Sequence, residues 1–217
     1  MEEQNSILSC PAPEGKVART IQALKKNHME AYYLPTKQDV VPALAKLLHP
    51  GDTVAVGGSQ TLAQCDVLKL LRSGEYEFLD RYQEGLSAEE LGEVFRDAFY
   101  ADAFVTSTNA VTENGELYNK DGTGNRVSAM IFGPKSVIVV AGVNKIVPDL
   151  HAAARRVKTV AAPLNAKRLS CKTPCAVTGE CADCSSDARI CCSTVILHQQ
   201  RIAGRIKVLL VGEELGY

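Results

Sequence analysis

Short apolar segments alternate with amphipathic helical segments along almost the whole chain. Strands are predicted at residues 31–34, 53–56, 76–79, 103–106, 136–141, 194–197 and 206–211. Helical patterns lie between most of them, as in residues 14–28, where Val17, Ile21 and Leu24 recur at helical spacing. Residues 136–141 are apolar on both faces, which is typical of a strand covered from both sides. The alternation predicts an α/β fold with a mainly parallel open sheet and helices on both faces.

Local signals also predict where several helices begin. Thr36 with Asp39, and Ser87 with Glu90, have the spacing of capping boxes. Pro148 is predicted to start a later helix, because proline is favoured in the first helical turn. Further helices are predicted around residues 62–71, 127–132 and 148–157.

Length and charge exclude several classes of protein. The chain has 217 residues, which suits one large domain or one domain with a small appendage. Its 24 basic and 25 acidic residues give a net charge of −1, which argues against a broadly basic nucleic-acid binder. The longest apolar run, 137–143, is too short to span a membrane. The first residues carry acids where a secretion signal would carry bases, so we expect a soluble, cytoplasmic protein.

Three polar motifs follow predicted strands. In residues 54–61 (VAVGGSQT), Gly57 and Gly58 would let the backbone approach an anion, and Ser59 and Thr61 would donate to it. The alternative is a tight strand-to-helix turn in which Ser59 is only the helix N-cap. Neither the Walker loop nor the dinucleotide fingerprint is present.

The second motif is the long polar stretch 106–126, in which Asn114-Gly115 predicts a hairpin turn. Asn109, Asn125 and Arg126 can supply hydrogen-bond donors and acceptors. Glu113 would serve as a nucleophile or general base, or else as a solvated turn residue.

The third motif, AGVNKI at 141–146, places Asn144 and Lys145 after the most buried strand. Lys145 would pair there with a phosphate or carboxylate, or else be a surface lysine. Because the carboxyl ends of parallel strands meet at one edge, the three motifs are expected to share a site for a small anionic metabolite.

Charge and cysteine gather toward the C-terminal part of the chain. A local basic excess includes Arg168 and Lys172 and predicts either a solvated helix face or an attraction for an anion. Six of the eight cysteines fall within 22 residues, in the pattern C-x3-C-x5-C-x2-C-x6-C-C. The predicted metal ligands are Cys171, Cys175, Cys181, Cys184 and Cys191, with Cys192 left over. An iron–sulfur cluster, a zinc ion, or thiols that are reduced or switch to disulfides all remain open.

Together these motifs resemble the LUD-domain family, which is named for lactate utilisation. The resemblance is carried by VAVGGSQTL, by TSTNAVTENGELYNKDGTGNRVSAMIFGP and by VIVVAGVNKIVPDLHAAARR. The tail NAKRLSCKTPCAVTGECADCSSDARIC resembles the stand-alone, cysteine-bearing branch. The resemblance implies one LUD-type domain over residues 1–217, including the cysteine-rich loop 171–192. It also implies a fold similar to the ribose-phosphate isomerase and CoA-transferase group.

The resemblance further implies a redox-associated role in the oxidation of lactate to pyruvate, beside iron–sulfur partner proteins. Glu113 in Thr-Glu-Asn-Gly resembles the nucleophilic glutamate of some CoA-transferases with this fold, which keeps an acyl or CoA-type transferase or hydrolase as an alternative. A regulatory ligand-binding protein with structural zinc is a third possibility.

Overall fold

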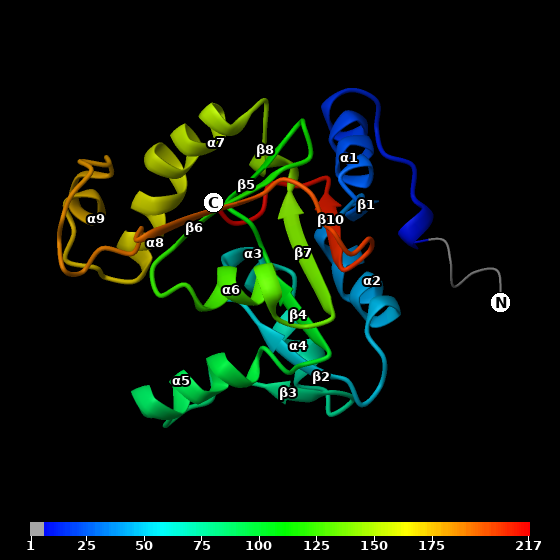
Figure 1. Ribbon diagram of the computed structural model, residues 1–217, viewed down its shortest axis with the longest axis horizontal. Coiled ribbons are helices and arrows are strands. Elements are labelled where there is room, and N and C mark those ends of the chain that lie inside the picture. The colour runs from blue at the N-terminus through cyan, green and yellow to red at the C-terminus, as the bar shows by residue number, and fades with distance from the viewer. Residues whose placement is uncertain (1–6) are drawn as a thin grey trace.

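The centre of the fold is a parallel sheet. In the computed structural model, which describes residues 7–217, six strands lie in the order β1-β10-β7-β4-β2-β3 (Figure 1). Every neighbouring pair in this sheet is parallel, so the predicted α/β class is confirmed. The acidic start at residues 1–6 lies outside the described residues. The strands are β1 Glu30–Leu34, β2 Thr53–Val56, β3 Glu77–Leu79, β4 Ala103–Thr106, β7 Ser136–Gly142 and β10 Ile206–Val211.

An apolar core covers both faces of this sheet, because side chains alternate along each strand. In β7, Val137 and Val139 pack into one core cluster, and Ile138 and Val140 pack into the other. The first face is covered by helices α1 (Lys16–Lys26) and α6 (Asn125–Phe132). The second is covered by α2 (Val40–Leu47), α3 (Gln60–Gln64) and α4 (Val67–Leu71).

A second sheet of four strands stands beside the first, in the order β8-β5-β6-β9. The predicted hairpin is present: β5 and β6 are antiparallel, and Gly115 has a φ of 80°. The predicted strand at 194–197 belongs to this sheet, where it pairs antiparallel with β6. The strands are β5 Ala110–Thr112, β6 Leu117–Asp121, β8 Ile146–Val147 and β9 Ser193–Leu197.

A long helical segment packs against the second sheet. Its parts follow each other without a break: α7 Leu150–Arg156, a π-helical stretch Val157–Ala161 and α8 Ala162–Arg168. Ala153 and Val157 on this segment contact Ala110 and Tyr118 of the sheet in a small apolar cluster. Beyond it lies the cysteine segment, residues 171–192, with the short helix α9 (Pro174–Thr178) (Figure 1).

The first residues of several helices can be compared with those predicted from local sequence signals. Both predicted capping boxes form, at Thr36 with Asp39 and at Ser87 with Glu90. The helix predicted from Pro148 instead begins after Asp149, whose carboxylate accepts from the amide of Ala152. The single helix predicted around 62–71 is two helices, because Asp66 between them adopts a left-handed φ of 55°.

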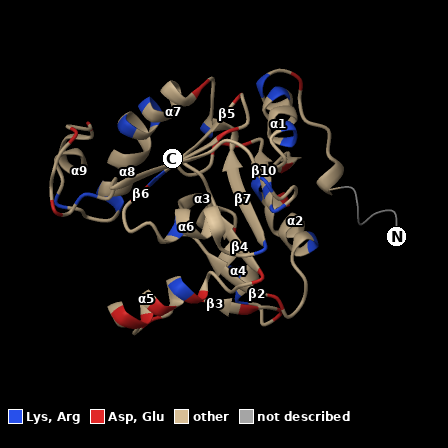
Figure 2. Cartoon of the chain, in the orientation of Figure 1, with Lys and Arg blue, Asp and Glu red and all other residues tan. Residues whose placement is uncertain are grey.

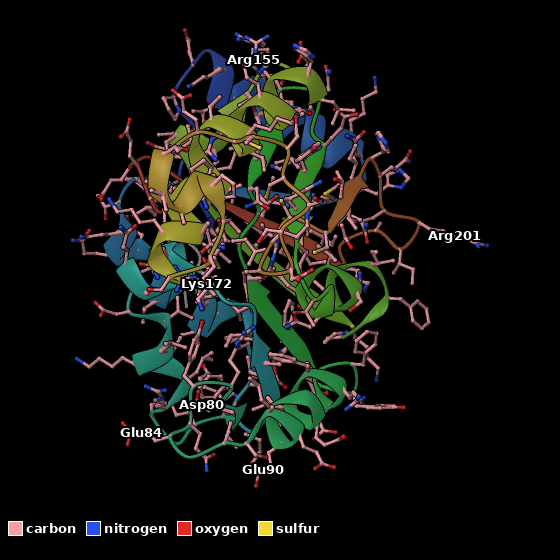
Figure 3. The ribbon with its side chains drawn as sticks, turned by 90° about the vertical axis from the view of Figure 1, so that its left-hand side faces the viewer. Asp80, Glu84, Glu90, Arg155, Lys172 and Arg201 are labelled. Atoms are coloured by element: carbon pink, nitrogen blue, oxygen red, sulfur yellow. The ribbon has the colours of Figure 1, made fainter. Side chains whose placement is uncertain are left out.

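Helix α5 (Ala88–Asp97) lies apart from the core and has no buried residue. Figure 2 shows its acidic residues, and Figure 3 shows Asp80, Glu84 and Glu90 at the end of the molecule opposite Arg155. Acidic charge is therefore concentrated at one end of the fold. Among the described residues, no helix is long and apolar enough to cross a membrane.

Candidate functional site

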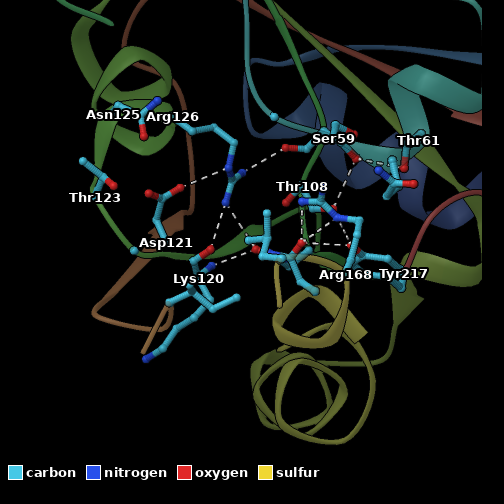
Figure 4. A pocket seen from close by; sticks show the side chains of 18 of the residues that line it. Ser59, Thr61, Thr108, Lys120, Asp121, Thr123, Asn125, Arg126, Arg168 and Tyr217 are labelled. Carbon is cyan, nitrogen blue, oxygen red and sulfur yellow. Dashed lines mark hydrogen bonds and ion pairs between the residues drawn. The ribbon is translucent and has the colours of Figure 1, made fainter. Parts of the chain in front are cut away.

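A cavity of about 250 Å³ opens at the carboxyl edge of the parallel sheet. Ser59 follows β2, Ser107 follows β4 and Lys145 follows β7, and all three line it. Figure 4 shows side chains from several elements converging on this space. Its other walls come from the end of β6, the first turn of α6, the end of α8, the loop after β3, Ile190 of the cysteine segment, and Tyr217. This edge is where open α/β sheets bind ligands.

The cavity brings together most of the residues predicted to bind the anion. Those that line it are Gly58, Ser59, Thr61, Asn109, Asn125, Arg126 and Lys145. Gly57 and Asn144 do not line it. Asn144 instead holds the segment 212–217: its amide oxygen accepts from the amide of Leu215 at 3.1 Å. Ser59 also caps α3, because its hydroxyl accepts from the amide of Leu62 at 3.3 Å. Ser59 is therefore a helix N-cap as well as a residue of the cavity wall.

Gly57 leaves room for a neighbouring side chain. An ideal Cβ on Gly57 would lie 2.4 Å from Oγ1 of Thr106 and 3.1 Å from the stem of Arg126. At Gly58 the nearest atom to such a Cβ would be the Arg81 guanidinium at 3.6 Å, an ordinary contact. Steric crowding therefore explains the glycine at position 57 but not the glycine at position 58.

We expect Gly57→Ala to lower the free energy of unfolding by about 1–3 kcal/mol, as overpacking of a filled site does. Gly58→Ala is the matched control, and we expect it to change stability by less than about 0.5 kcal/mol, as most well-tolerated substitutions do. Urea denaturation of both variants checks this. Equal losses in the two variants would contradict the steric explanation.

Arg126 braces the cavity wall with all five of its N–H groups. Nε donates to Asp121 at 3.1 Å, and Nη1 donates to the Asn119 side chain at 2.7 Å and to the carbonyl of Ser107 at 3.0 Å. Nη2 donates to the Asn109 side chain at 3.3 Å and to the carbonyl of Lys120 at 3.0 Å. Burial lowers the pKa of Arg126, and Asp121 acts in the opposite direction. Arg126 therefore positions the wall and has no donor left for a ligand.

Arg81 is the opposite case. Its guanidinium lines the cavity and lies 4.6 Å from the centre of the Phe95 ring. Within residues 7–217 it makes no hydrogen bond or ion pair. Burial lowers the pKa of Arg81, whereas Tyr82 and Asp121 act in the opposite direction without forming an ion pair with it. The sequence patterns did not single it out, although it follows the predicted strand 76–79 just as the other motifs follow theirs.

Lys145 is almost fully buried, with 3% of its surface exposed. Its Nζ donates to Oγ1 of Thr61 at 2.9 Å, to Oγ of Ser107 at 3.0 Å and to the carbonyl of Thr108 at 3.2 Å. Burial and, to a smaller extent, the nearby positive charges of Arg156 and Arg126 together lower the pKa of Lys145 to about 7. The surface-lysine alternative is therefore wrong.

This lysine makes stability depend on pH. The unfolded chain keeps the proton up to about pH 10, while the folded chain releases it near pH 7, so the folded state gains stability as the pH rises between these values. Subtracting the unfolding free energy of Lys145→Met from that of the wild type removes the contribution of the other titrating groups. We expect this difference to rise by on the order of 2 kcal/mol between about pH 7 and about pH 9. Urea denaturation at both pH values measures it. A difference that stays constant with pH would contradict the buried, depressed lysine.

Arg168 and Tyr217 stand at the rim of the cavity. Nε of Arg168 donates to the Tyr217 hydroxyl at 2.7 Å and to the Asn165 side chain at 3.1 Å, and all three residues line the cavity. The basic excess in the sequence pointed to Arg168, but neither Asn165 nor Tyr217 carried a sequence signal. Five cations line the cavity, Arg81, Lys120, Arg126, Lys145 and Arg168, against one acid, Asp121.

The structure does not bring Glu113 to the cavity. Its carboxylate accepts from Nη2 of Arg19 on α1 at 2.7 Å and from Nε of the same residue at 3.1 Å. It does not line the cavity, because it lies beyond the far end of β5, at the turn of the hairpin. A nucleophilic Glu113 would have to reach the shared cavity, so this role has no geometric support, and the position agrees with the alternative of a turn residue.

The tail cysteines do not gather around one centre. Cys191 Sγ accepts from Nη2 of Arg189 at 3.6 Å, and Cys175 Sγ lies 3.4 Å from the Thr173 hydroxyl. In the part of the chain that the structure describes, no group of three or more His, Cys, Asp or Glu side chains is placed to hold a metal. The predicted ligands do not fit a metal ion or cluster in this arrangement, because they do not converge on one centre among the described residues.

The metal prediction at Cys171, Cys175, Cys181, Cys184 and Cys191 therefore requires the loop to rearrange. It is tested by iron, zinc and acid-labile sulfide per chain in protein purified without oxygen. If these cysteines hold a metal, we expect about one equivalent or more of bound metal per chain, the stoichiometry of a strongly held structural centre. Less than about a tenth of an equivalent would contradict it, given the usual affinity of such centres.

Comparison with known protein families identifies the family of this chain. A family model described as the LUD domain matches residues 17–211, which is most of the chain. The chain belongs to the LUD-domain family. The match includes the parallel sheet and every residue that lines the cavity except Tyr217, so the resemblance drawn from the motifs is confirmed.

One solved structure supports the fold of this LUD domain. A DUF162 family protein from Deinococcus radiodurans is similar over 92% of this chain and 100% of its own, with a TM-score of 0.55 and 14% identity. Weaker likenesses include the alpha subunit of a malonate decarboxylase from Acinetobacter baumannii, at 13% identity, 93% of this chain, 37% of that chain and a TM-score of 0.40. Another is eIF2B beta from Chaetomium thermophilum, at 20% identity, 52% of this chain, 43% of that chain and a TM-score of 0.35. No curated protein matches the sequence significantly.

Proposed function

We propose that the cavity of this LUD domain binds a small metabolite carrying a carboxylate or phosphate group. The observation that carries the proposal is Arg81, a partly buried guanidinium that lines the cavity and has no acceptor among the described residues. A guanidinium offers a planar fork of N–H donors that matches carboxylate and phosphate oxygens. Five cations against one acid support the same ligand charge.

The size of the cavity restricts the ligand further. A volume of about 250 Å³ is at or below the low end of ordinary ligand pockets, which span roughly 300–1,000 Å³. A metabolite of a few carbon atoms suits such a space, whereas a dinucleotide does not. The absence of both nucleotide-binding glycine motifs from the sequence agrees with this choice.

A role in lactate utilisation is a finer part of the proposal. It is supported by the resemblance of the motifs, and lactate and pyruvate have the charge and size that the cavity favours. The six clustered thiols support a redox association. They lie in the cysteine segment, residues 171–192, which contributes Ile190 to the cavity wall.

Thermal unfolding with a panel of anions tests the proposal. Inorganic phosphate, pyruvate and L-lactate are compared with chloride at equal ionic strength. At about a hundredfold excess over the dissociation constant, a bound ligand stabilises by about 2.7 kcal/mol, which raises Tm by about 5–10 °C for a chain of this size. We expect that shift with phosphate, and with pyruvate or lactate if the lactate role holds. Equal Tm values in chloride and in every other anion would contradict the proposal.

A further inference from the structure

Lys145 is the most deeply buried cation of the cavity, and it forms no ion pair with an acid among the described residues. Its three hydrogen-bond partners within the described residues are two hydroxyls, of Thr61 and Ser107, and the carbonyl of Thr108. Thr61 and Thr108 stand on the cavity wall (Figure 4), and Ser107 lines the cavity with them. A buried ammonium is expensive without a carboxylate beside it, so this environment favours the neutral amine.

The hydroxyl partners suit the neutral form. A hydroxyl is both donor and acceptor, so Thr61 or Ser107 can donate to the amine lone pair once the ammonium has lost its proton. The charged and titratable groups that act on Lys145 are Arg156 on α7, Arg126 on α6 and Cys65 at the end of α3. Both arginines disfavour the ammonium, and its pKa of about 7 leaves about half of the amine uncharged at neutral pH.

A neutral amine in an anion-binding cavity has a specific chemistry. Uncharged lysine adds to carbonyl groups, and lysines are activated for it by desolvation or by neighbouring cations. Both conditions hold at Lys145. The anion-binding groups Arg81 and Arg168 line the same cavity, so the charged end of a ligand and its reacting carbon would be held by different side chains.

We propose that Lys145 forms an imine with the carbonyl group of an anionic aldehyde or 2-oxo acid bound in this cavity. This inference rests on the proposed function and names the reacting residue and substrate class. The lone pair of Nζ attacks the carbonyl carbon and gives a carbinolamine. One amine proton moves to the former carbonyl oxygen as the carbinolamine forms. The C–O bond then breaks, the hydroxyl leaves with the second amine proton as one molecule of water, and a C=N bond remains. No electrons are transferred, and the hydroxyls of Thr61 and Ser107 are placed to pass protons between nitrogen and oxygen.

The test traps the imine in the full-length protein. Glyoxylate is added with cyanoborohydride, which reduces the imine to a stable carboxymethyl amine, and the labelled lysines are mapped by mass spectrometry. We expect Lys145 to be labelled at neutral pH at least about tenfold faster than exposed lysines, because its neutral fraction is far larger. Its labelling rate should rise with a midpoint near pH 7, the pKa given by its environment. Inorganic phosphate at saturating concentration should suppress labelling at this residue only.

Two variants test whether the label is specific to Lys145. Lys145→Arg keeps the charge and should abolish labelling at that position, and Lys167→Arg, an exposed neighbour of the rim, should leave labelling of Lys145 unchanged. If Lys145→Arg does not fold, the site map, the pH profile and the phosphate protection of the wild type decide alone.

The outcomes separate this inference from the proposed function. An unlabelled Lys145 in protein whose Tm rises with phosphate would overturn the imine and leave anion binding intact. An unlabelled Lys145 with no phosphate effect on Tm would overturn both. Labelling that phosphate does not suppress would contradict a carbonyl held in the anion site.

Discussion

Arg81→Met is expected to weaken phosphate binding by about tenfold to a hundredfold, because hydrogen bonds to a charged group contribute about 1.5–3 kcal/mol. The guanidinium makes no hydrogen bond within residues 7–217, so its loss should leave folding nearly unchanged. Methionine keeps an apolar side chain beside Phe95 and removes only the charge and the donors. Isothermal titration calorimetry with phosphate at constant ionic strength gives the affinity.

Arg96→Met is the matched control for Arg81. It also removes one positive charge, but Arg96 is exposed on α5, does not line the cavity and pairs with Glu93 at 2.8 Å. We expect phosphate affinity within about twofold of the wild type, since an exposed charge is largely screened. Equal losses in both variants would mean that net charge matters and that Arg81 has no direct contact with the ligand.

Arg126→Met is expected to cost about 3–5 kcal/mol of unfolding free energy, the usual penalty for removing one partner of a buried ion pair. Only 11% of the Arg126 side chain is exposed, and 9% of that of Asp121. Among the described residues, the change would leave the Asp121 carboxylate with the amide of Gly124 at 2.7 Å as its remaining hydrogen bond, and the carbonyl of Ser107 with the hydroxyl of Thr106 at 3.2 Å as its remaining donor. Urea denaturation measures the loss.

Arg155→Met provides the comparison for Arg126. Arg155 is exposed on α7, and within residues 7–217 its guanidinium hydrogen-bonds to His151 alone, one helical turn away at 2.9 Å. We expect less than about 0.5 kcal/mol, as for most surface substitutions. A loss below about 1 kcal/mol at Arg126, the ordinary effect of a point substitution, would refute its role as the brace of the wall.

Patterns within one segment of sequence predicted much of this fold. Residues 136–141 are apolar on both faces, and β7 does carry core on both faces of the sheet. The polar motifs after β2, β4 and β7 meet because parallel strands present their carboxyl ends at one edge. That rule needs no knowledge of which strands are neighbours, so it works from sequence.

Features that depend on strand order or direction were not predictable in this way. Arg81 reaches Gly58 only because β3 pairs with β2 at the edge of the sheet. Glu113 lies four residues beyond Asn109 along an extended strand, which carries it about 13 Å away at the usual rise per residue. Asn144 is turned to the segment 212–217, a contact between residues distant in sequence.

The burial of Lys145 could not be predicted from the sequence either, because it depends on elements that are distant along the chain. From the sequence it is one lysine in AGVNKI, and its depressed pKa comes from burial together with Arg156 and Arg126, which lie on two other elements. The cysteine segment shows the reverse: a dense local pattern whose thiols are not brought together in this arrangement. Spacing gives possible ligands, but the backbone decides whether they converge.

The central claim is that the cavity holds a small anion beside Arg81. A crystal of the protein grown without phosphate or sulfate and soaked in selenate tests this most directly, since anomalous scattering from selenium locates the anion. The account predicts a peak inside the cavity, within hydrogen-bond distance of the Arg81 guanidinium, that is lost in crystals of Arg81→Met. A cavity without a peak, in crystals where selenate binds elsewhere, would contradict it.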